Sequence, residues 1–199
     1  MRAFLGIALP KSAQQSLAVL QGELATSRAD VKWVEPATLH LTLKFLDEIS
    51  DAQCHAIEVL LARIASREEP FSLRVEGVGA FPSVGAPRVI WVGLAEGKEI
   101  VARIAGAIEQ EGDALALRRE ERPFAGHLTL GRVRSSRNRQ ALTQCLRATV
   151  WKSPPPWRVS TLTLYQSVLS PAGPSYAVLA DVPLGSLRQL HPHDEVPSP

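Results

Sequence analysis

His40-Leu41-Thr42-Leu43 and His127-Leu128-Thr129-Leu130 are two copies of one tetrapeptide, 87 residues apart in a chain of 199. Successive side chains of a β-strand point to opposite faces, so in each copy the histidine and the threonine share one face while both leucines point behind it. Only five histidines occur in the chain, two of them open the copies, and Pro36 and Pro123 each stand four residues before them. The repeat therefore predicts two related lobes that each supply one strand to a common site.

The composition is that of an ordinary globular protein, with 45% hydrophobic and 21% charged residues. A formal net charge of +2 is too small to mark a dedicated nucleic-acid binder. No apolar run approaches the length of a membrane-spanning helix, and the start from Arg2 to Leu9 resembles a first strand more than a signal peptide. Cys54 and Cys145 have no motif around them, which indicates reduced thiols in a cytoplasmic protein.

Strand and helix patterns alternate along the chain. The expected strands cover residues 2–9, 37–46, 71–78, 88–94, 126–133, 158–167 and 175–182. The expected helices cover residues 12–26, the segment that follows the capping-box pattern of Ser50 to Gln53, residues 99–117 and residues 138–148. A Gly/Pro-rich stretch, residues 79–87, is expected to join two of the strands as a loop. This order favours an α+β fold with mixed or antiparallel sheets, and no glycine-rich loop supports dinucleotide binding.

The paired histidines and threonines suit chemistry on a phosphate. An imidazole titrates near neutral pH, so one ring can act as general base while its partner acts as general acid. Threonine hydroxyls donate hydrogen bonds to phosphate oxygens without adding a titrating charge. The alternative is that each histidine is satisfied by a backbone carbonyl, beside threonines present for their strand propensity. A metal site is a weaker rival, because zinc needs three or four ligands and no third ligand accompanies the second copy.

Charge differs between the surroundings of the two copies. Seven arginines and two glutamates lie between Arg118 and Arg139, whereas two lysines and five acidic residues lie between Asp30 and Asp51. Arginine grips phosphates through a planar fork, so the second copy is the expected side for a polynucleotide backbone. Arg132 follows His127 by five residues, and strict alternation puts it on the opposite face. A role for Arg132 therefore requires a bulge at Gly131 or a bend.

Four segments resemble a known family. Trp33-Val34-Glu35-Pro36 to Glu48 resembles the first signature of the RNA 2′,3′-cyclic phosphodiesterases, once called 2′-5′ RNA ligases, of the 2H phosphoesterase superfamily. Phe124 to Arg132 resembles the second signature, and Phe81 to Gly93 and Leu164 to Leu184 also match the family's style. The chain departs from the family at Gly126, where a proline usually precedes the second histidine, and at Asp47, where a glycine is usual. Both departures touch the backbone and leave the reactive side chains intact.

The resemblance implies a bilobed α+β fold in which two pseudo-symmetric lobes, with helices outside, surround a central cleft. Residues 1–184 would form this single domain, and residues 185–199 are expected to be a disordered tail. By resemblance, His127 is the proton acceptor that activates water and His40 the proton donor to the leaving oxygen. Thr42 and Thr129 would hold the nonbridging oxygens and Arg132 would add positive charge, with no metal or other cofactor. The residues by themselves do not decide which histidine is acid and which is base.

The leading hypothesis is an enzyme that opens a terminal RNA 2′,3′-cyclic phosphate to a 2′-phosphomonoester, with reversible 2′-5′ RNA ligation as an additional candidate reaction. Its expected partners are RNA ends that carry this cyclic phosphate, with tRNA fragments or nucleotides as candidates, and no membrane. We expect a cytoplasmic monomer. One alternative is a noncatalytic module that binds RNA ends or nucleotides. Another is a phosphodiesterase for a different small cyclic or oligoadenylate substrate.

Overall fold

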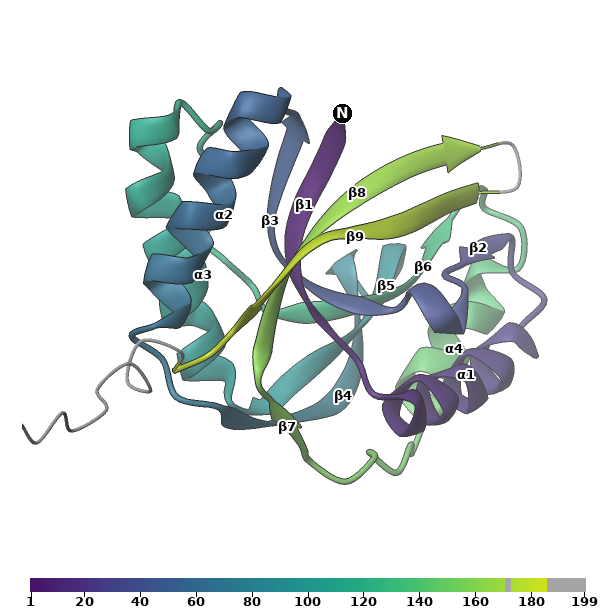
Figure 1. Cartoon of the computed structure of the whole chain (residues 1–199). Helices are drawn as coiled ribbons and strands as arrows, with labels where there is room; N and C mark the ends of the chain where they lie inside the picture. Colours follow the sequence, from purple (N-terminus) through teal and green to yellow (C-terminus); the bar gives the residue numbers. More distant parts are fainter. Residues whose placement is uncertain (171–172, 186–199) are drawn as a thin grey trace, which may run out of the picture.

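The computed structural model describes residues 1–170 and 173–185. Within these residues the strands form two antiparallel sheets with helices on their outer sides (Figure 1). The first sheet has the order β3-β1-β8-β9, with strands β3 (His40–Glu48), β1 (Arg2–Ala8), β8 (Thr161–Ser170) and β9 (Gly173–Pro183). The second sheet has the order β2-β6-β5-β4-β7, with strands β2 (Val31–Trp33), β6 (His127–Val133), β5 (Ala86–Glu96), β4 (Phe71–Ser83) and β7 (Trp157–Val159).

Each sheet has its own pair of helices. The helices are α1 (Lys11–Ala25), α2 (Asp51–Ala65), α3 (Lys98–Gly112) and α4 (Arg139–Ala148), with short 3-10 turns at η1 (Pro36–Thr38) and η2 (Asp113–Leu115). Helices α2 and α3 lie side by side against the first sheet, and α1 and α4 lie together beside the second (Figure 1). The predicted α+β class with outer helices is confirmed. One copy of the tetrapeptide lies in each sheet, in β3 and in β6.

The core forms where the sheets meet their helices. On β1, Leu5 and Ile7 are fully buried, and α1 contributes Leu17, Leu20 and Leu24 at helical spacing. The predicted capping box at the start of α2 is present: the Ser50 hydroxyl accepts from the Gln53 backbone N–H, and the Gln53 side chain accepts from the Ser50 backbone N–H. We call the face of each sheet that lies away from these buried side chains its open face.

The expected loop at residues 79–87 is wrong, because this stretch is the end of a long hairpin. Strand β4 runs to Ser83 and β5 begins at Ala86, with Val84 and Gly85 between them. Gly79 is a strand residue that makes room for a ring, since a Cβ on it would lie 2.4 Å from the Trp91 indole. The prolines of the hairpin, Pro82 and Pro87, pair with each other near its tip. These residues look like loop residues in the sequence but here serve close packing and a turn.

Other boundaries also differ from expectation. The strand expected over residues 37–46 begins at His40, after η1, and the strand expected over 158–167 is divided at Ser160 between the two sheets. The three-residue strands β2 and β7 are too short to produce a recognisable alternation. Cys54 lies in α2 and Cys145 in α4, both as free thiols that are partly exposed. The expected tail falls on residues 186–199, outside the described residues, except for Gly185, whose N–H donates to the Ala65 carbonyl.

Candidate active site

The two copies of the tetrapeptide have the same local geometry. In each strand the leucines are buried, whereas the histidine and the threonine are partly exposed on the open face, as the alternation predicts. His40 Nδ1 lies 2.8 Å from the Thr38 carbonyl and His127 Nδ1 lies 2.6 Å from the Ala125 carbonyl. A carbonyl oxygen only accepts, so Nδ1 carries the hydrogen in a neutral ring and Nε2 is the nitrogen left for chemistry. The expected backbone carbonyl is therefore present and engages one nitrogen of each ring.

A β-bulge follows the threonine in both copies. Gly6 pairs with Thr42 and Leu5 with Lys44, so Leu43 is the extra residue of β3. In β6, the extra residue is Leu130, between Thr129 and Gly131. The bulge shifts the alternation by one position, and the second residue after each extra leucine returns to the open face.

This shift determines the face on which Arg132 lies. It is exposed in β6, and its register partner on β5 is Val89, two positions from Trp91, which pairs with Thr129. Arg132 thus shares the open face with His127 and Thr129. The bulge that the sequence required for a role of Arg132 is present, with Leu130 as the extra residue. At the matching position of β3 stands Phe45, whose side chain is also exposed.

Aromatic rings surround His40. The Phe4 ring centroid lies 4.5 Å from the His40 centroid, and Tyr176 meets the imidazole edge-on at 5.0 Å. Tyr165 stacks on Phe4 with 4.9 Å between the ring centroids, and its centroid lies 6.1 Å from that of His40. Burial lowers the pKa of His40 below its usual value of 6.5, and the contact with the Thr38 carbonyl opposes this shift. His40 in the free protein is therefore biased toward its neutral form.

His127 has a more open setting. Phe81 meets its ring edge-on at 5.1 Å, and Trp91 lies 6.4 Å away. Phe81 is itself exposed, in contrast to the buried Phe4 beside His40. The two imidazoles are thus chemically alike but differ in burial, which is the condition under which one pair of identical groups takes two roles.

Three contacts bring the two copies to one region. Strands β3 and β6 lie within contact distance of each other although they belong to different sheets. The positive charge of Arg132 acts on Tyr176, opposing the rise that burial causes in the pKa of that phenol. Since Tyr176 rests against His40, the end of β6 reaches the surroundings of the first histidine. The expectation that His40, Thr42, Thr129 and Arg132 share one site with His127 is consistent with these contacts.

Lys44 ties the first copy to the segment before the second. Its Nζ is buried and lies 2.5 Å from Glu109 Oε2 of α3 and 2.7 Å from the Arg118 carbonyl. Glu109 also accepts the backbone N–H of Glu120 at 2.8 Å. Lys44, which directly follows the extra residue of the β3 bulge, therefore helps to hold the segment that precedes His127.

Gln21 supports the bulge of the second copy. From α1, its buried amide donates to the carbonyl of Leu130 at 2.9 Å and to that of Val34 at 2.7 Å. Gly131 allows β2 to approach, because a Cβ there would lie 2.7 Å from Val31 Cγ1. Sequence reasoning missed the roles of Gln21 and Lys44, since an isolated polar residue in a helix or strand carries no local signal of burial. It also gave no role to the aromatic group, although a period-two pattern through Tyr165 was visible.

The two departures from the family pattern have backbone consequences. Asp47 adopts a left-handed φ of 55°, which glycine accepts at no steric cost and aspartate tolerates better than most residues. Gly126 lies close to Leu94, and a Cβ on it would come within 2.6 Å of Leu94 Cδ1. Neither change alters the histidine or the threonine of either copy.

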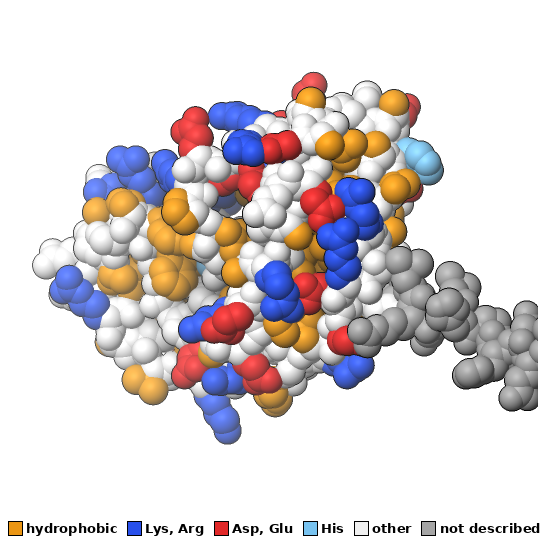
Figure 2. All heavy atoms as spheres, turned by 90° about the vertical axis from the view of Figure 1, so that its left-hand side faces the viewer, with side chains coloured by type: hydrophobic (Ala, Val, Ile, Leu, Met, Phe, Trp, Pro, Cys, Tyr) orange, Lys and Arg blue, Asp and Glu red, His pale blue; other side chains and the backbone are white. Residues whose placement is uncertain are grey.

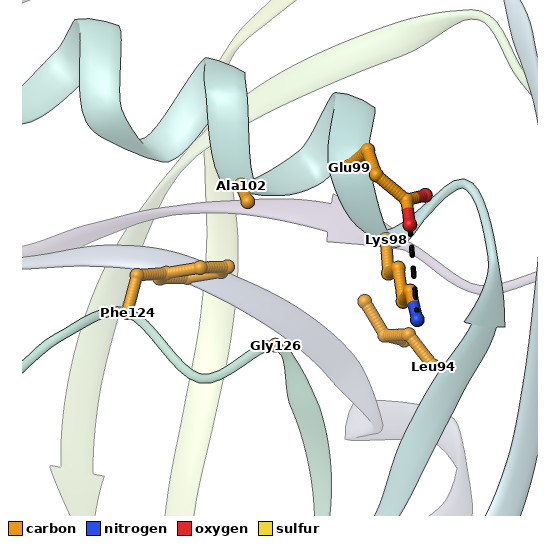
Figure 3. Close-up of a pocket in the computed structure, with 6 residues that line it drawn as sticks. All are labelled: Leu94, Lys98, Glu99, Ala102, Phe124 and Gly126. Atoms are coloured by element: carbon orange, nitrogen blue, oxygen red, sulfur yellow. Dashed lines mark ion pairs between the residues drawn. The ribbon is translucent and has the colours of Figure 1, made fainter.

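Two hollows of the surface are lined by residues other than the candidate ones. Figure 3 shows one of them between the start of α3 and the segment that enters β6, lined by Leu94, Lys98, Glu99, Ala102, Phe124 and Gly126. A second, polar hollow lies at the start of α4. Neither is lined by His40 or His127, so the candidate site is located by its side chains. Among the described residues no group of three or more His, Cys, Asp or Glu is placed to hold a metal.

A comparison with protein families reproduces the internal repeat. The family LigT like Phosphoesterase matches residues 7–91 and, a second time, residues 92–176. The chain belongs to this family. Each match contains one copy of the tetrapeptide, so the two halves of the chain correspond to the family unit twice. The predicted family and the predicted classification as a phosphodiesterase are confirmed.

Relatives and solved structures agree with this assignment. RNA 2′,3′-cyclic phosphodiesterase of Methanothermobacter thermautotrophicus is 34% identical over 88% of this chain and 95% of its own length. The enzyme of the same name from Archaeoglobus fulgidus is 35% identical over 88% and 96%. TT0787 of Thermus thermophilus matches with a TM-score of 0.75 at 29% identity, over 93% of this chain and 98% of its own. E. coli LigT complexed with 3′-AMP matches with a TM-score of 0.74 at 25% identity, over 92% and 97%.

Proposed function

We propose that this protein hydrolyses a terminal RNA 2′,3′-cyclic phosphate to a 2′-phosphomonoester. The observation that carries the proposal is the duplicated histidine, held in each copy by a carbonyl on Nδ1 with Nε2 free. The relatives named RNA 2′,3′-cyclic phosphodiesterase supply the substrate class, and the likeness to LigT with bound 3′-AMP agrees with a nucleotide ligand. The helices of the described residues include none long and apolar enough to cross a bilayer.

The proposed reaction uses one histidine for each proton. His127 Nε2 takes a proton from water, and the water oxygen forms a bond to phosphorus. The bond from phosphorus to the ribose 3′ oxygen breaks, and His40 gives its proton to that oxygen. Thr42 and Thr129 donate hydrogen bonds to the nonbridging oxygens, and Arg132 supplies positive charge as negative charge develops there. In ligation the 5′ hydroxyl of another RNA replaces water: its oxygen bonds to phosphorus, the bond to the 3′ oxygen breaks, and His40 protonates that oxygen, which leaves a 2′-5′ linkage.

The acid role of His40 requires that its imidazole become protonated when the substrate binds. Burial lowers the pKa of His40 in the free protein, which favours the neutral form. A phosphodiester anion beside the imidazole favours the charged form and raises the pKa again. We propose that His40 binds its proton together with the substrate. The opposite assignment, with His40 as base, fits the neutral ring of the free protein. The two assignments predict different rates for the histidine variants when the leaving group is changed.

The test is turnover of an RNA that ends in a 2′,3′-cyclic phosphate, in the presence of excess chelator, with identification of the product phosphate. His40→Ala and His127→Ala should each lower the rate by about 10² to 10⁴. His55→Ala is the matched control, because His55 is an exposed histidine on α2 that should leave the rate unchanged. Undiminished activity in either active-site variant would refute the assignment. A 3′-phosphate product would show that the other ester bond is broken.

Two other functions give different results in the same assay. A noncatalytic module would bind the RNA end without ever forming product. A phosphodiesterase for another small cyclic or oligoadenylate substrate would open that compound faster than the RNA. A panel of tRNA fragments, short RNAs and nucleotides with cyclic ends would rank the candidate substrates. Monomeric state and cytoplasmic location stay predictions.

A further inference from the structure

Two cations lie opposite each other on neighbouring strands beside the candidate site. Strand β2 pairs antiparallel with β6, and Lys32 is the direct partner of Arg132. Direct partners project from the same face of a sheet, and like charges in such a pair destabilise it. Both side chains are exposed, and neither forms an ion pair with any residue of the described ranges 1–170 and 173–185. An anion between them would remove the repulsion.

The position of this pair relates it to the reacting groups. The β6 bulge turns Arg132 to the open face that carries His127 and Thr129, and Lys32 stands on that face too, one strand further out. One strand spacing is about 5 Å. Burial raises the pKa of Tyr176, the charge of Arg132 opposes this rise, and the Tyr176 ring contacts the His40 ring edge-on. The pair therefore borders the site without being part of the duplicated tetrapeptides.

Charges elsewhere on the molecule are arranged differently. Figure 2 shows acidic and basic side chains interspersed over the α2 and α3 face. There Arg63 and Arg67 both pair with Glu111, and Arg103 pairs with Glu68. Near Lys32 the carboxylates in the chain are those of Asp30 and Glu35, which flank β2, and neither is ion-paired with it.

The basic character continues beyond the pair. Arg134 comes directly after β6, and the polar hollow at the start of α4 is lined in part by Ser136, Asn138 and Arg139. These cations come from β2, the end of β6 and the start of α4, and a series of unpaired cations matches the repeating phosphates of a single-stranded nucleic acid.

We propose that Lys32 binds a second phosphate, the one on the 5′ side of the nucleotide that carries the cyclic phosphate, while Arg132 lies between this phosphate and the reacting one. This rests on the proposed function and specifies its substrate class: the end of an RNA chain, and not a free nucleoside 2′,3′-cyclic phosphate. The reacting phosphate is held by the tetrapeptide residues, whereas Lys32 stands one strand beyond Arg132 and meets the neighbouring phosphate. Lys32 is thus a specificity-determining residue that a mononucleotide does not reach.

The test compares two substrates in wild type and in Lys32→Ala. The substrates are a trinucleotide and a nucleoside, each ending in a 2′,3′-cyclic phosphate. We expect the variant to lower kcat/KM for the trinucleotide about tenfold, as for loss of one charge-assisted hydrogen bond, and to leave the nucleoside unchanged. The dependence of log kcat/KM on log salt should become shallower by about 0.7 for the trinucleotide alone. Lys32→Arg should restore most of the rate, and Lys152→Ala, at an exposed lysine of the connector before β7, is the matched control.

The outcomes separate this proposal from the proposed function. An equal loss on both substrates would place Lys32 at the reacting phosphate, and no loss on either would make it a solvated charge; each overturns the proposal. If wild type opens neither substrate, the proposed function fails. The second phosphate site is then tested by comparing the equilibrium affinities of a trinucleotide 3′-phosphate and a nucleoside 3′-phosphate. Binding of the trinucleotide alone should weaken about tenfold in Lys32→Ala.

Discussion

At the scale of single residues, the chemistry depends on the setting of two identical side chains. The sequence alone predicts that histidine and threonine share a face, because parity in a strand is fixed. It does not predict the carbonyl contacts of Thr38 and Ala125, which select the free nitrogen. Nor does it predict that Phe4 and two tyrosines bury His40, because those rings come from distant strands. Residue types and faces were therefore predictable, but protonation states were not.

The roles of the two histidines predict different responses to the leaving group. A thiolate departs without prior protonation far more readily than an alkoxide, so a 2′,3′-cyclic phosphate with sulfur in place of the 3′ oxygen has little need of a general acid. With this substrate, we expect His40→Ala to keep a rate close to that of wild type and His127→Ala to lose about 10² or more. Appearance of the free 3′ thiol, measured with a thiol reagent, gives the rate directly. If His127→Ala is the variant that is rescued, the acid and base are exchanged.

The pKa of His40 also predicts how stability depends on pH. Because burial lowers it below 6.5, the unfolded chain binds a proton at a pH where the folded ring is still neutral. The free energy of unfolding contributed by this ring is therefore constant above about pH 6.5 and falls as the pH drops toward the folded-state pKa. Urea unfolding of wild type and His40→Asn between about pH 5 and pH 8 measures this. A difference between the two proteins that does not change with pH would contradict it.

At the scale of elements, the bulge in each copy decides what reaches the open face. The sequence indicated only that Arg132 needed such an irregularity. The residues that support it in the second copy are Gln21 on α1 and Gly131, which lies against β2. The bulge position and its support depend on tertiary packing, so no local pattern predicts them.

Gln21 is expected to hold Arg132 in place through the bulge. Gln21→Leu removes the donor that the Leu130 and Val34 carbonyls share, which should lower the free energy of unfolding by about 1–3 kcal/mol. Urea unfolding measures this, with Gln15→Leu on the exposed side of α1 as control. Arg132→Ala should also cost less activity in the Gln21→Leu background than in wild type. Equal costs in both backgrounds would show that Gln21 acts on stability alone.

At the scale of the whole molecule, each half of the chain contributes one copy of the tetrapeptide, and the two copies lie in different sheets. The family matches the chain twice, at residues 7–91 and 92–176. The same duplication is seen in the tetrapeptide, which occurs once in β3 and once in β6. The fold class and most elements were predictable because the alternation of strands and helices is clear. The strands β4 and β5 were predicted, but not their continuation to the hairpin tip, since the glycines and prolines there serve packing against Trp91 and a tight turn. Short strands such as β2 exist only through their pairing with β6.

The central claim is that His40 and His127 act on the same phosphorus atom. The most direct measurement is the rate of cyclic-phosphate opening by His40→Ala, His127→Ala and the double variant. Groups that act as a unit in one step are strongly non-additive, so we expect the double variant to be no more than a few-fold slower than the slower single variant. Losses that multiply in the double variant would mean that the two histidines act independently, and would contradict a single shared site.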